Sequence, residues 1–105
     1  MFDLTGKCAL VTGASGGIGR TIAKQLKVQG AVVGLSGTRV EVLQALADEL
    51  GDGAYVLPAD LSSTAGVDLL ISDARAAIGN IDILVNNAGL SRDNLAMRMK
   101  DDDWK

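Results

Sequence analysis

Apolar residues follow two different patterns along this chain, and the two patterns alternate. Mainly apolar runs of four to six residues indicate buried strands at 8–11, 31–36, 54–57 and 81–85. Between these runs, apolar residues recur every three or four positions, which is typical of a helix with one buried face. The chain is therefore expected to alternate strand and helix, starting with a strand, before a polar tail.

The three predicted helices have recognisable ends. The first covers 17–29, and the second begins with a capping box in which Thr38 is the N-cap and Glu41 reaches back to it. A glycine that can end the helix follows each apolar repeat, at positions 30, 51 and 79. The residues expected on the buried faces are Ile18, Ile22, Ala23 and Leu26 in the first helix, Val40, Leu43, Leu46, Ala47 and Leu50 in the second, and Val67, Leu70, Ile71, Ala74 and Ile78 in the third.

Strand–helix alternation with short joints predicts an α/β fold, a Rossmann-type doubly wound parallel sheet with helices on both faces. The order βαβαβαβ corresponds to the N-terminal half of that fold, in which the strands lie in the spatial order 3-2-1-4. The 105 residues are expected to form one domain, 1–105, because no linker, repeat or low-complexity tract interrupts them.

The amino-acid composition argues against several classes of function for this chain. A net charge of −3 argues against a nucleic-acid partner, which usually leaves a basic face. With no histidine and a single cysteine, no metal site is expected, and Cys8 is expected to be an inert core residue of the first strand. No apolar run approaches the ~18 residues of a membrane span, and no signal-peptide pattern is present, so a cytoplasmic protein without a membrane partner is expected.

Glycines and polar residues gather where the predicted strands end. Gly13-x-x-x-Gly17-x-Gly19 follows the first strand and runs into the first helix, which brings backbone N–H groups close to a phosphate. The other three ends carry Ser36–Arg39, Asp60-Leu61 and Asn86–Gly89. In a parallel sheet the carboxyl ends of the strands share one edge, where ligands bind. Together these four features predict a bound nucleotide.

Several of these polar residues have two interpretations. Arg39 lies near the position where an acid would bind the 2′-hydroxyl of NAD. The arginine either pairs with the 2′-phosphate of NADP or is simply an exposed residue in the first turn of a helix. Asp60 either caps its own loop or accepts a hydrogen bond from an adenine amino group. Asn86 and Asn87 either form a turn or belong to a network that fixes the fourth strand beside the glycine turn.

These motifs resemble those of the short-chain dehydrogenase/reductases. Thr12-Gly13-x-x-x-Gly17-x-Gly19 and Asn86-Asn87-Ala88-Gly89 are similar to two signatures of that family, and the segment 91–100 with Trp104 is similar to its 3-oxoacyl-[acyl-carrier-protein] reductases. The resemblance covers essentially the whole chain. It implies NADPH-dependent reduction of a β-ketoacyl thioester, carried on acyl-carrier protein, in fatty-acid synthesis.

The resemblance also implies cofactor-binding roles for named residues. The glycine turn would hold the pyrophosphate and nearby ribose, Thr38 and Arg39 the 2′-phosphate, and Asp60 with Leu61 the adenine. The turn residues are Gly13, Ala14, Ser15, Gly16, Gly17, Ile18 and Gly19, and the ribose is bordered by Asn87, Ala88 and Gly89. Many NADPH-preferring relatives carry a basic residue in place of Gly16, so one phosphate contact is expected to be absent.

The catalytic residues of the family have no counterpart in this sequence. Its Ser, Asn and Tyr-x-x-x-Lys would lie beyond residue 105, and Tyr55, the single tyrosine, has no lysine four positions later. The resemblance therefore implies a cofactor-binding half that is inactive alone, because it lacks a general acid. The alternative is a non-enzymatic half-Rossmann module that forms homo-oligomers through the edge of the fourth strand, Ile81–Val85, or by exchanging its C-terminal segment.

Three further ligand classes are disfavoured by the sequence. The P-loop pattern G-x-x-x-x-G-K-[ST] is absent, which excludes that class of NTPase. A methyltransferase would need an acid after the second strand, and Ser36–Arg39 contains none. Asp101-Asp102-Asp103 fits the start of a helix better than a metal site, because consecutive carboxylates point in different directions.

Overall fold

The alternation of strands and helices is confirmed by the computed structural model, which describes residues 3–87. Each predicted strand overlaps its observed counterpart, and each predicted helix is present. In chain order the elements are β1 (Cys8–Thr12), α1 (Gly17–Val28), β2 (Val32–Gly37), α2 (Val40–Leu50), β3 (Ala54–Pro58), α3 (Thr64–Ile78) and β4 (Ile83–Asn86).

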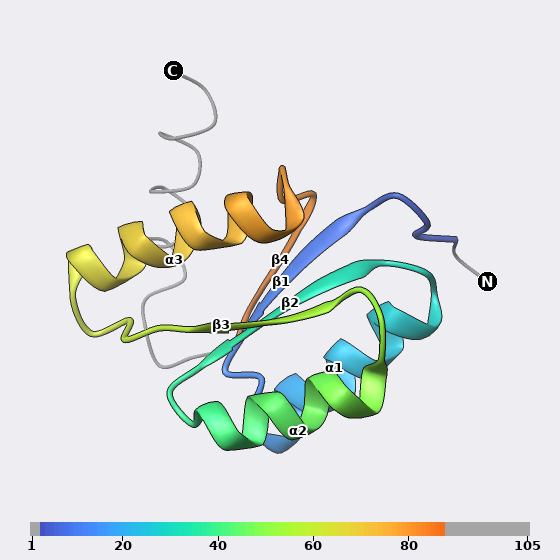
Figure 1. Ribbon diagram of the computed structural model, residues 1–105, viewed down its shortest axis with the longest axis horizontal. Helices are drawn as coiled ribbons and strands as arrows, with labels where there is room; N and C mark the ends of the chain where they lie inside the picture. The colour runs from blue at the N-terminus through green and yellow to red at the C-terminus, as the bar shows by residue number, and fades with distance from the viewer. Residues whose placement is uncertain (1–2, 88–105) are drawn as a thin grey trace.

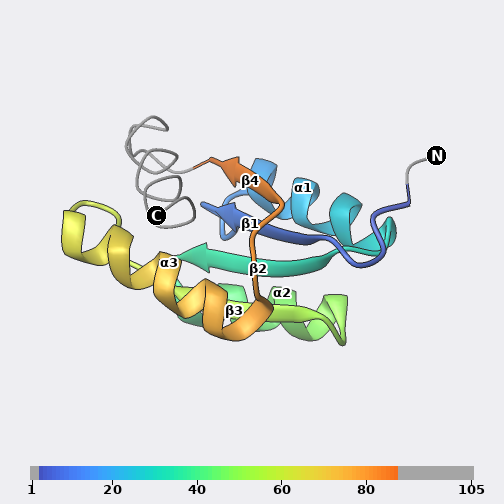
Figure 2. The ribbon, with the colours of Figure 1, turned by 90° about the horizontal axis from the view of Figure 1, so that it is seen from above.

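The strands form one parallel sheet in the order β3-β2-β1-β4, so the predicted strand order is confirmed. Figure 1 shows α3 on one face of the sheet and α1 and α2 on the other, as right-handed crossovers require. Figure 2 shows that the arrowheads of β1, β2 and β4 point to the same end of the sheet. The carboxyl ends of the strands therefore meet at one edge, where the predicted site residues lie.

Each face of the sheet has its own core. Side chains such as Val11 and Leu35 pack against α1 and α2, whereas Leu10 and Leu57 point the other way and pack beneath α3. Gly34, at the centre of β2, leaves room there for the side chains of Leu10 and Leu57. The predicted buried face of α3 is confirmed in full: Val67, Leu70, Ile71, Ala74 and Ile78 are all buried.

The glycines predicted to end the helices are confirmed. Gly30, Gly51 and Gly79 have positive φ angles of 103°, 83° and 84°. The capping box at Thr38 is wrong, because β2 continues to Gly37 and α2 starts at Val40. Arg39 is therefore the N-cap, no side chain caps the helix, and Glu41 is the second helical residue instead of the third.

Two residues that were assigned to buried helix faces are exposed. Ile18 has 69% of its surface exposed, and Val40 has 45%. Both lie in the first turn of their helix, directly after a strand end. An apolar repeat predicts which side of a helix faces the core, but not how far along the helix the sheet covers that side.

β4 starts two residues later than predicted, because Asp82 joins β1 from outside the strand. Its N–H donates to the Cys8 carbonyl at 2.8 Å, and its carboxylate accepts from the Cys8 N–H at 2.9 Å. Cys8 is partly exposed and not a core residue, and its thiol donates to the Ile78 carbonyl. Burial, followed by the Asp82 charge, raises the pKa of the thiol, which favours its less reactive protonated form.

Candidate functional site

A tight turn joins β1 to α1 and is held by backbone groups. Gly13 has φ of 64°, which glycine adopts without strain. The Gly16 N–H donates to the Gly13 carbonyl at 3.1 Å, and the Ala14 N–H donates to the Ser36 carbonyl on β2 at 3.0 Å. The second bond fixes the turn against the end of the neighbouring strand.

The other glycines of the motif have two different structural roles. A methyl group on Gly19 would lie 2.9 Å from the Gly13 carbonyl carbon and 3.0 Å from the Ala14 Cα, closer than ordinary contacts allow. A methyl group on Gly17 would meet no atom of residues 3–87 within 4 Å, and one on Gly16 would meet only the Gly13 carbonyl oxygen at 3.5 Å. Gly19 thus permits the close packing of helix on turn, whereas Gly16 and Gly17 leave open space in front of α1.

The N-terminus of α1 opens onto this space, and its own first turn supplies no counter-charge. Its N-cap is Gly16, no side chain accepts a hydrogen bond from the first turn, and that turn contains no acidic residue. α3 differs, because the hydroxyl of its N-cap, Ser63, accepts from the Gly66 N–H. The first N–H groups of a helix lack intrahelical partners and carry partial positive charge, so the start of α1 suits an anionic group such as a phosphate.

A buried hydroxyl links the ends of β1 and β4. The Thr12 side chain is fully buried; its Oγ1 donates to the Asn86 Oδ1 at 3.0 Å and accepts from the Asn87 N–H at 2.9 Å. Thr12 and Asn86 are also register partners of the two strands. Of the two interpretations of the asparagine pair, the network that fixes β4 beside the glycine turn is confirmed.

Two buried polar atoms at the same edge have no hydrogen-bond partner within the described chain. They are the Asn86 Nδ2 on β4 and the Ser36 Oγ on β2, and Ser36 is fully buried. Buried polar groups almost always have a partner, because an unpaired one costs about 1–3 kcal/mol. The two strands beside β1, β2 and β4, therefore each carry a buried polar atom that forms no hydrogen bond within residues 3–87.

The end of β2 presents a cation to solvent. Arg39 is exposed at the start of α2 and makes no ion pair with any residue in 3–87, whereas Arg20 is bound to Glu49 at 2.9 Å. Thr38 is exposed beside it, outside the helix. The first turn of α2 has no side-chain cap but contains Glu41, so the exposed Arg39 guanidinium, and not the helix end alone, provides a second place for a negative group.

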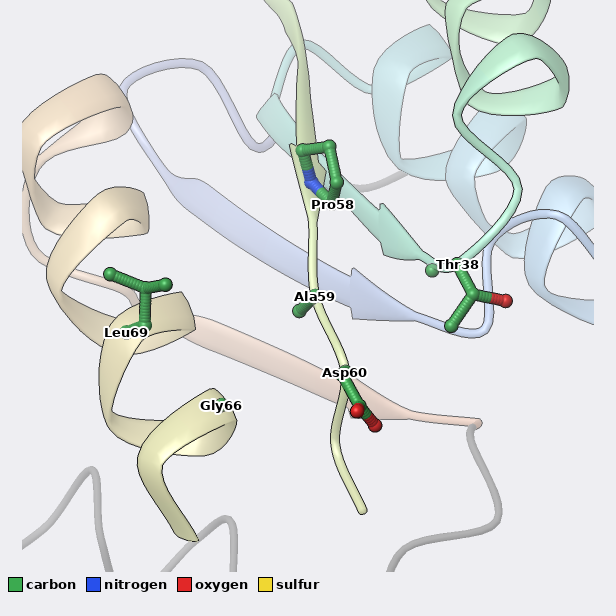
Figure 3. A pocket seen from close by; sticks show the side chains of 7 residues that line it. Thr38, Pro58, Ala59, Asp60, Gly66 and Leu69 are labelled. Atoms are coloured by element: carbon green, nitrogen blue, oxygen red, sulfur yellow. The ribbon is translucent and has the colours of Figure 1, made fainter. Parts of the chain in front are cut away.

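A pocket of about 380 Å³ opens beside Thr38, between the ends of β2 and β3 and the first turns of α3. Figure 3 shows Leu69 of α3 on one side of the segment 58–60 and Thr38 on the other. The walls of the pocket are mainly apolar, and Thr38 and Asp60 are its polar side chains. The complete lining is Gly37, Thr38, Pro58, Ala59, Asp60, Gly66 and Leu69.

Asp60 caps its own loop, which is one of its two interpretations. Its Oδ1 accepts from the Ser62 hydroxyl at 2.6 Å and from the Ser62 N–H at 3.0 Å. These two bonds lower the pKa of the Asp60 carboxyl, so it is charged at neutral pH. Its second role, toward an adenine amino group, remains a prediction. Leu61 is half-buried and packs against the core beneath α3, and its predicted contact with the adenine stays a prediction.

Comparison with known proteins identifies the family. Residues 7–105 match the family model described as short chain dehydrogenase. The chain belongs to this family. Among curated relatives it is 58% identical to nodulation protein G of Rhizobium sp. (strain N33) over 99% of its own length, and 48% identical to the 3-oxoacyl-[acyl-carrier-protein] reductase FabG of Escherichia coli (strain K12) over 97%. In both cases it spans 42% of the length of the relative.

Solved structures of the family have the same fold. The 3-ketoacyl-(acyl-carrier-protein) reductase of Brucella melitensis, complexed with NADH, is 41% identical with a TM-score of 0.79, over 84% of this chain and 36% of that one. The RhlG/NADP active-site complex of Pseudomonas aeruginosa is 44% identical with a TM-score of 0.78, over 86% of this chain and 37% of that one.

Most predicted site residues of this chain meet at one edge of the sheet. The glycine turn, Thr38, Arg39, Asp60 and Asn87 all follow strand ends there, while Ala88 and Gly89 lie outside the described residues. Within 3–87, no three histidine, cysteine or acidic side chains form a group that could hold a metal ion. The same part of the chain contains no helix long and apolar enough to cross a membrane.

Sequence reasoning missed most of the pocket. Four of its lining residues, Pro58, Ala59, Gly66 and Leu69, were not assigned to the site. One signal was present: Leu69 interrupts the buried repeat of α3 at a position that faces away from the core. The capacity of Thr12 to bond both asparagines also went unrecognised, although Thr12 begins the family motif.

Proposed function

We propose that this chain is the cofactor-binding part of an NADPH-dependent 3-oxoacyl-[acyl-carrier-protein] reductase of fatty-acid biosynthesis in the cytoplasm. The observation that carries the proposal is the meeting, at one sheet edge, of an uncapped helix N-terminus, the exposed Arg39 and a mainly apolar pocket. Their chemistry corresponds to the pyrophosphate, the 2′-phosphate and the adenine ring of the cofactor. When bound, NADPH supplies the hydride for a β-ketoacyl thioester carried on acyl-carrier protein.

The residues of the chain would hold the cofactor and do not take part in the chemistry. The N–H groups at the start of α1 would donate to the pyrophosphate, which the open space at Gly16 and Gly17 admits. Arg39 would pair with the 2′-phosphate, with Thr38 beside it. The unused Asn86 amide lies on the strand that leads to Asn87, Ala88 and Gly89, which would border the ribose.

The similarity to FabG of E. coli supports the substrate class, because that reductase is 48% identical to this chain over 97% of its length. Solved relatives carry NADH in one case and NADP in another, so the family allows both cofactors. The exposed Arg39 supports NADPH in the proposal, since a guanidinium can pair with the 2′-phosphate, whereas NADH would call for an acid at this position to bind its 2′-hydroxyl.

Calorimetric titration with NADPH and NADH tests cofactor preference. The chain is expected to bind NADPH more tightly, and Arg39→Ala is expected to weaken NADPH binding roughly tenfold, the size of one charge-assisted hydrogen bond, while leaving NADH binding unchanged. Arg20→Ala is the matched control, because it removes the same charge from a side chain that is already bound to Glu49. Equal affinity for both cofactors, or an equal effect of the two substitutions, would contradict the role of Arg39.

The 105-residue chain alone is expected to show no NADPH oxidation with acetoacetyl-CoA. Its sequence has no Tyr-x-x-x-Lys, so no side chain of that pattern can donate the proton that the carbonyl oxygen needs. A measurable rate from the purified chain would show that other residues supply this proton, and would overturn the assignment of the chain as a binding part only.

A second candidate function is self-association, and one observation favours it. Among the described residues β4 has a partner strand on one side only, and its apolar residues Ile83, Leu84 and Val85 are all partly exposed. Such an edge can pair with the same edge of a second copy. We expect a homo-oligomer formed through β4 or by exchange of the C-terminal segment. Sedimentation at tens of micromolar, roughly the range in which exposed edges associate, tests this expectation. A clean monomer at that concentration would refute it.

A further inference from the structure

Leu69 is a large apolar side chain that the core does not use. Its neighbours Leu70 and Ile71 lie on the buried face of α3, but Leu69 itself has 60% of its surface exposed. A single exposed leucine is common on protein surfaces and needs no explanation by itself. Leu69 differs because it lines the pocket at the ends of β2 and β3 (Figure 3).

The position of this leucine is fixed by close backbone packing one turn earlier. A methyl group on Gly66 would run into the carbonyl oxygen of Asp60, so the first turn of α3 lies directly against the end of β3. The Gly66 N–H is also bonded to the Ser63 hydroxyl at 3.0 Å. The distance between Leu69 and the segment 58–60 is therefore set by the fold, and the pocket is preformed.

The pocket has the chemistry of a site for a flat heterocycle. Its volume of about 380 Å³ falls within the roughly 300–1,000 Å³ usual for small-ligand sites. Leu69, Pro58 and Ala59 line it with uncharged apolar side chains, and the one charged side chain of the lining is Asp60, at the end of the segment 58–60. The polar side chains, Thr38 and Asp60, are few, which is typical of pockets that take a ring by its faces and orient it by its edge.

We propose that Leu69 is an affinity-determining residue for the purine base of the cofactor, covering one face of the ring. This inference rests on the proposed function, and it adds a residue of α3 to a site that otherwise consists of strand ends and the starts of α1 and α2. Leu69 acts on the base alone. Its contribution appears with any ligand that contains adenine, and is absent with ligands that contain only the nicotinamide half.

Calorimetric titration of the full 105-residue chain with three probes tests this inference: NADPH, adenosine 2′,5′-bisphosphate and reduced nicotinamide mononucleotide. Leu69→Ala is expected to weaken the two adenine-containing probes by a similar factor, roughly three- to tenfold for the loss of part of one apolar wall, and to leave the mononucleotide unchanged. Val28→Ala is the matched control, since Val28 is equally apolar, 75% exposed and outside the pocket lining. Circular dichroism checks that both variants are folded.

The outcomes separate this inference from the proposed function. If the unmodified chain binds NADPH and Leu69→Ala binds it equally well, the role of Leu69 is refuted and the proposed function stands. An equal loss of affinity in Val28→Ala, or a loss that extends to the mononucleotide, refutes it as well. If the unmodified chain binds none of the three probes, the proposed function and the inference fail together.

Discussion

Gly19 is a position where both the packing of α1 and the shape of the glycine turn depend on the absence of a side chain. In Gly19→Ala the new methyl group would lie 2.9 Å from the Gly13 carbonyl carbon and 3.0 Å from the Ala14 Cα. Both are backbone atoms of a turn that is bonded to β2, so neither can move aside like the end of a flexible side chain. The helix must shift away from the strand end instead.

The size of this effect follows from two opposing contributions. Overpacking against a rigid core costs about 1–3 kcal/mol, and contact with backbone belongs at the upper end of that range. Alanine in place of glycine in a helix returns at most about 1 kcal/mol. We therefore expect Gly19→Ala to lower the free energy of unfolding by about 2 kcal/mol, or Tm by roughly 8–16 °C for a chain of this size.

Thermal unfolding followed by circular dichroism measures this difference, and Gly17→Ala is the matched control. Gly17 lies two residues earlier in the same helix, and a methyl group there would meet nothing within 4 Å of the described chain. The Tm of the Gly17→Ala chain is expected to stay the same or rise slightly. A Gly19→Ala chain with unchanged Tm, or a Gly17→Ala chain that loses as much, would show that close packing on the turn is not what requires glycine.

Three further substitutions test other parts of the site. Gly16→Arg is expected to tighten NADPH binding roughly tenfold in calorimetry without affecting NADH, because the position has φ of −85° and open space for a side chain that reaches the 2′-phosphate. Thr12→Val is expected to lower the free energy of unfolding in urea by about 2–4 kcal/mol, since it leaves two amide groups unpaired, whereas Thr21→Val on the surface should change it little. Ser62→Ala is expected to raise the pKa of Asp60, measured by NMR of the carboxyl carbon, because both bonds that lower it come from Ser62 or its backbone and the hydroxyl bond is the larger. The stabilisation from that lowered pKa is present above about pH 4 and is lost as the pH falls through the folded-state value, so the variant should be less stable than the parent chain at neutral pH, and this difference should disappear in the acid range.

The arrangement of the sheet could be predicted from sequence because few alternatives satisfy the physical rules. Apolar runs separated by helical repeats favour parallel strands with right-handed crossovers, and β3-β2-β1-β4 is the order expected for this half of a Rossmann-type sheet. The buried face of α3 was predicted residue by residue, because all of that face lies over the sheet. Local pattern and global fold agree along these stretches.

The first turns of the helices were predicted less well, for a common reason. Thr38 has the right chemistry for an N-cap, but the chain stays in β2 for one residue more, held by pairing with β3. Ile18 fits the apolar repeat, but the core does not extend to the beginning of α1. At such joints, tertiary pairing sets the boundary and local propensity has little influence.

The pocket could not be predicted, because no single segment contains it. Its lining comes from the ends of β2 and β3 and from one side of α3, and depends on how closely Gly66 lets that helix approach Asp60. A sequence motif records residues that are near each other along the chain. The wall formed by Leu69 arises from packing between separate elements, so it becomes visible only when the elements are assembled.

The bonds between β1 and β4 also bear on the order in which the chain folds. Asp82 and Cys8 are bonded at one end of the pair, Asn86 and Thr12 at the other, and both pairs are 74 residues apart in sequence. Contacts that close so long a loop form late, because the entropy of closure must be overcome before they contribute. β4 should therefore dock last onto a preassembled β3-β2-β1 sheet, and its amide protons should exchange with solvent sooner than those of β1 and β2.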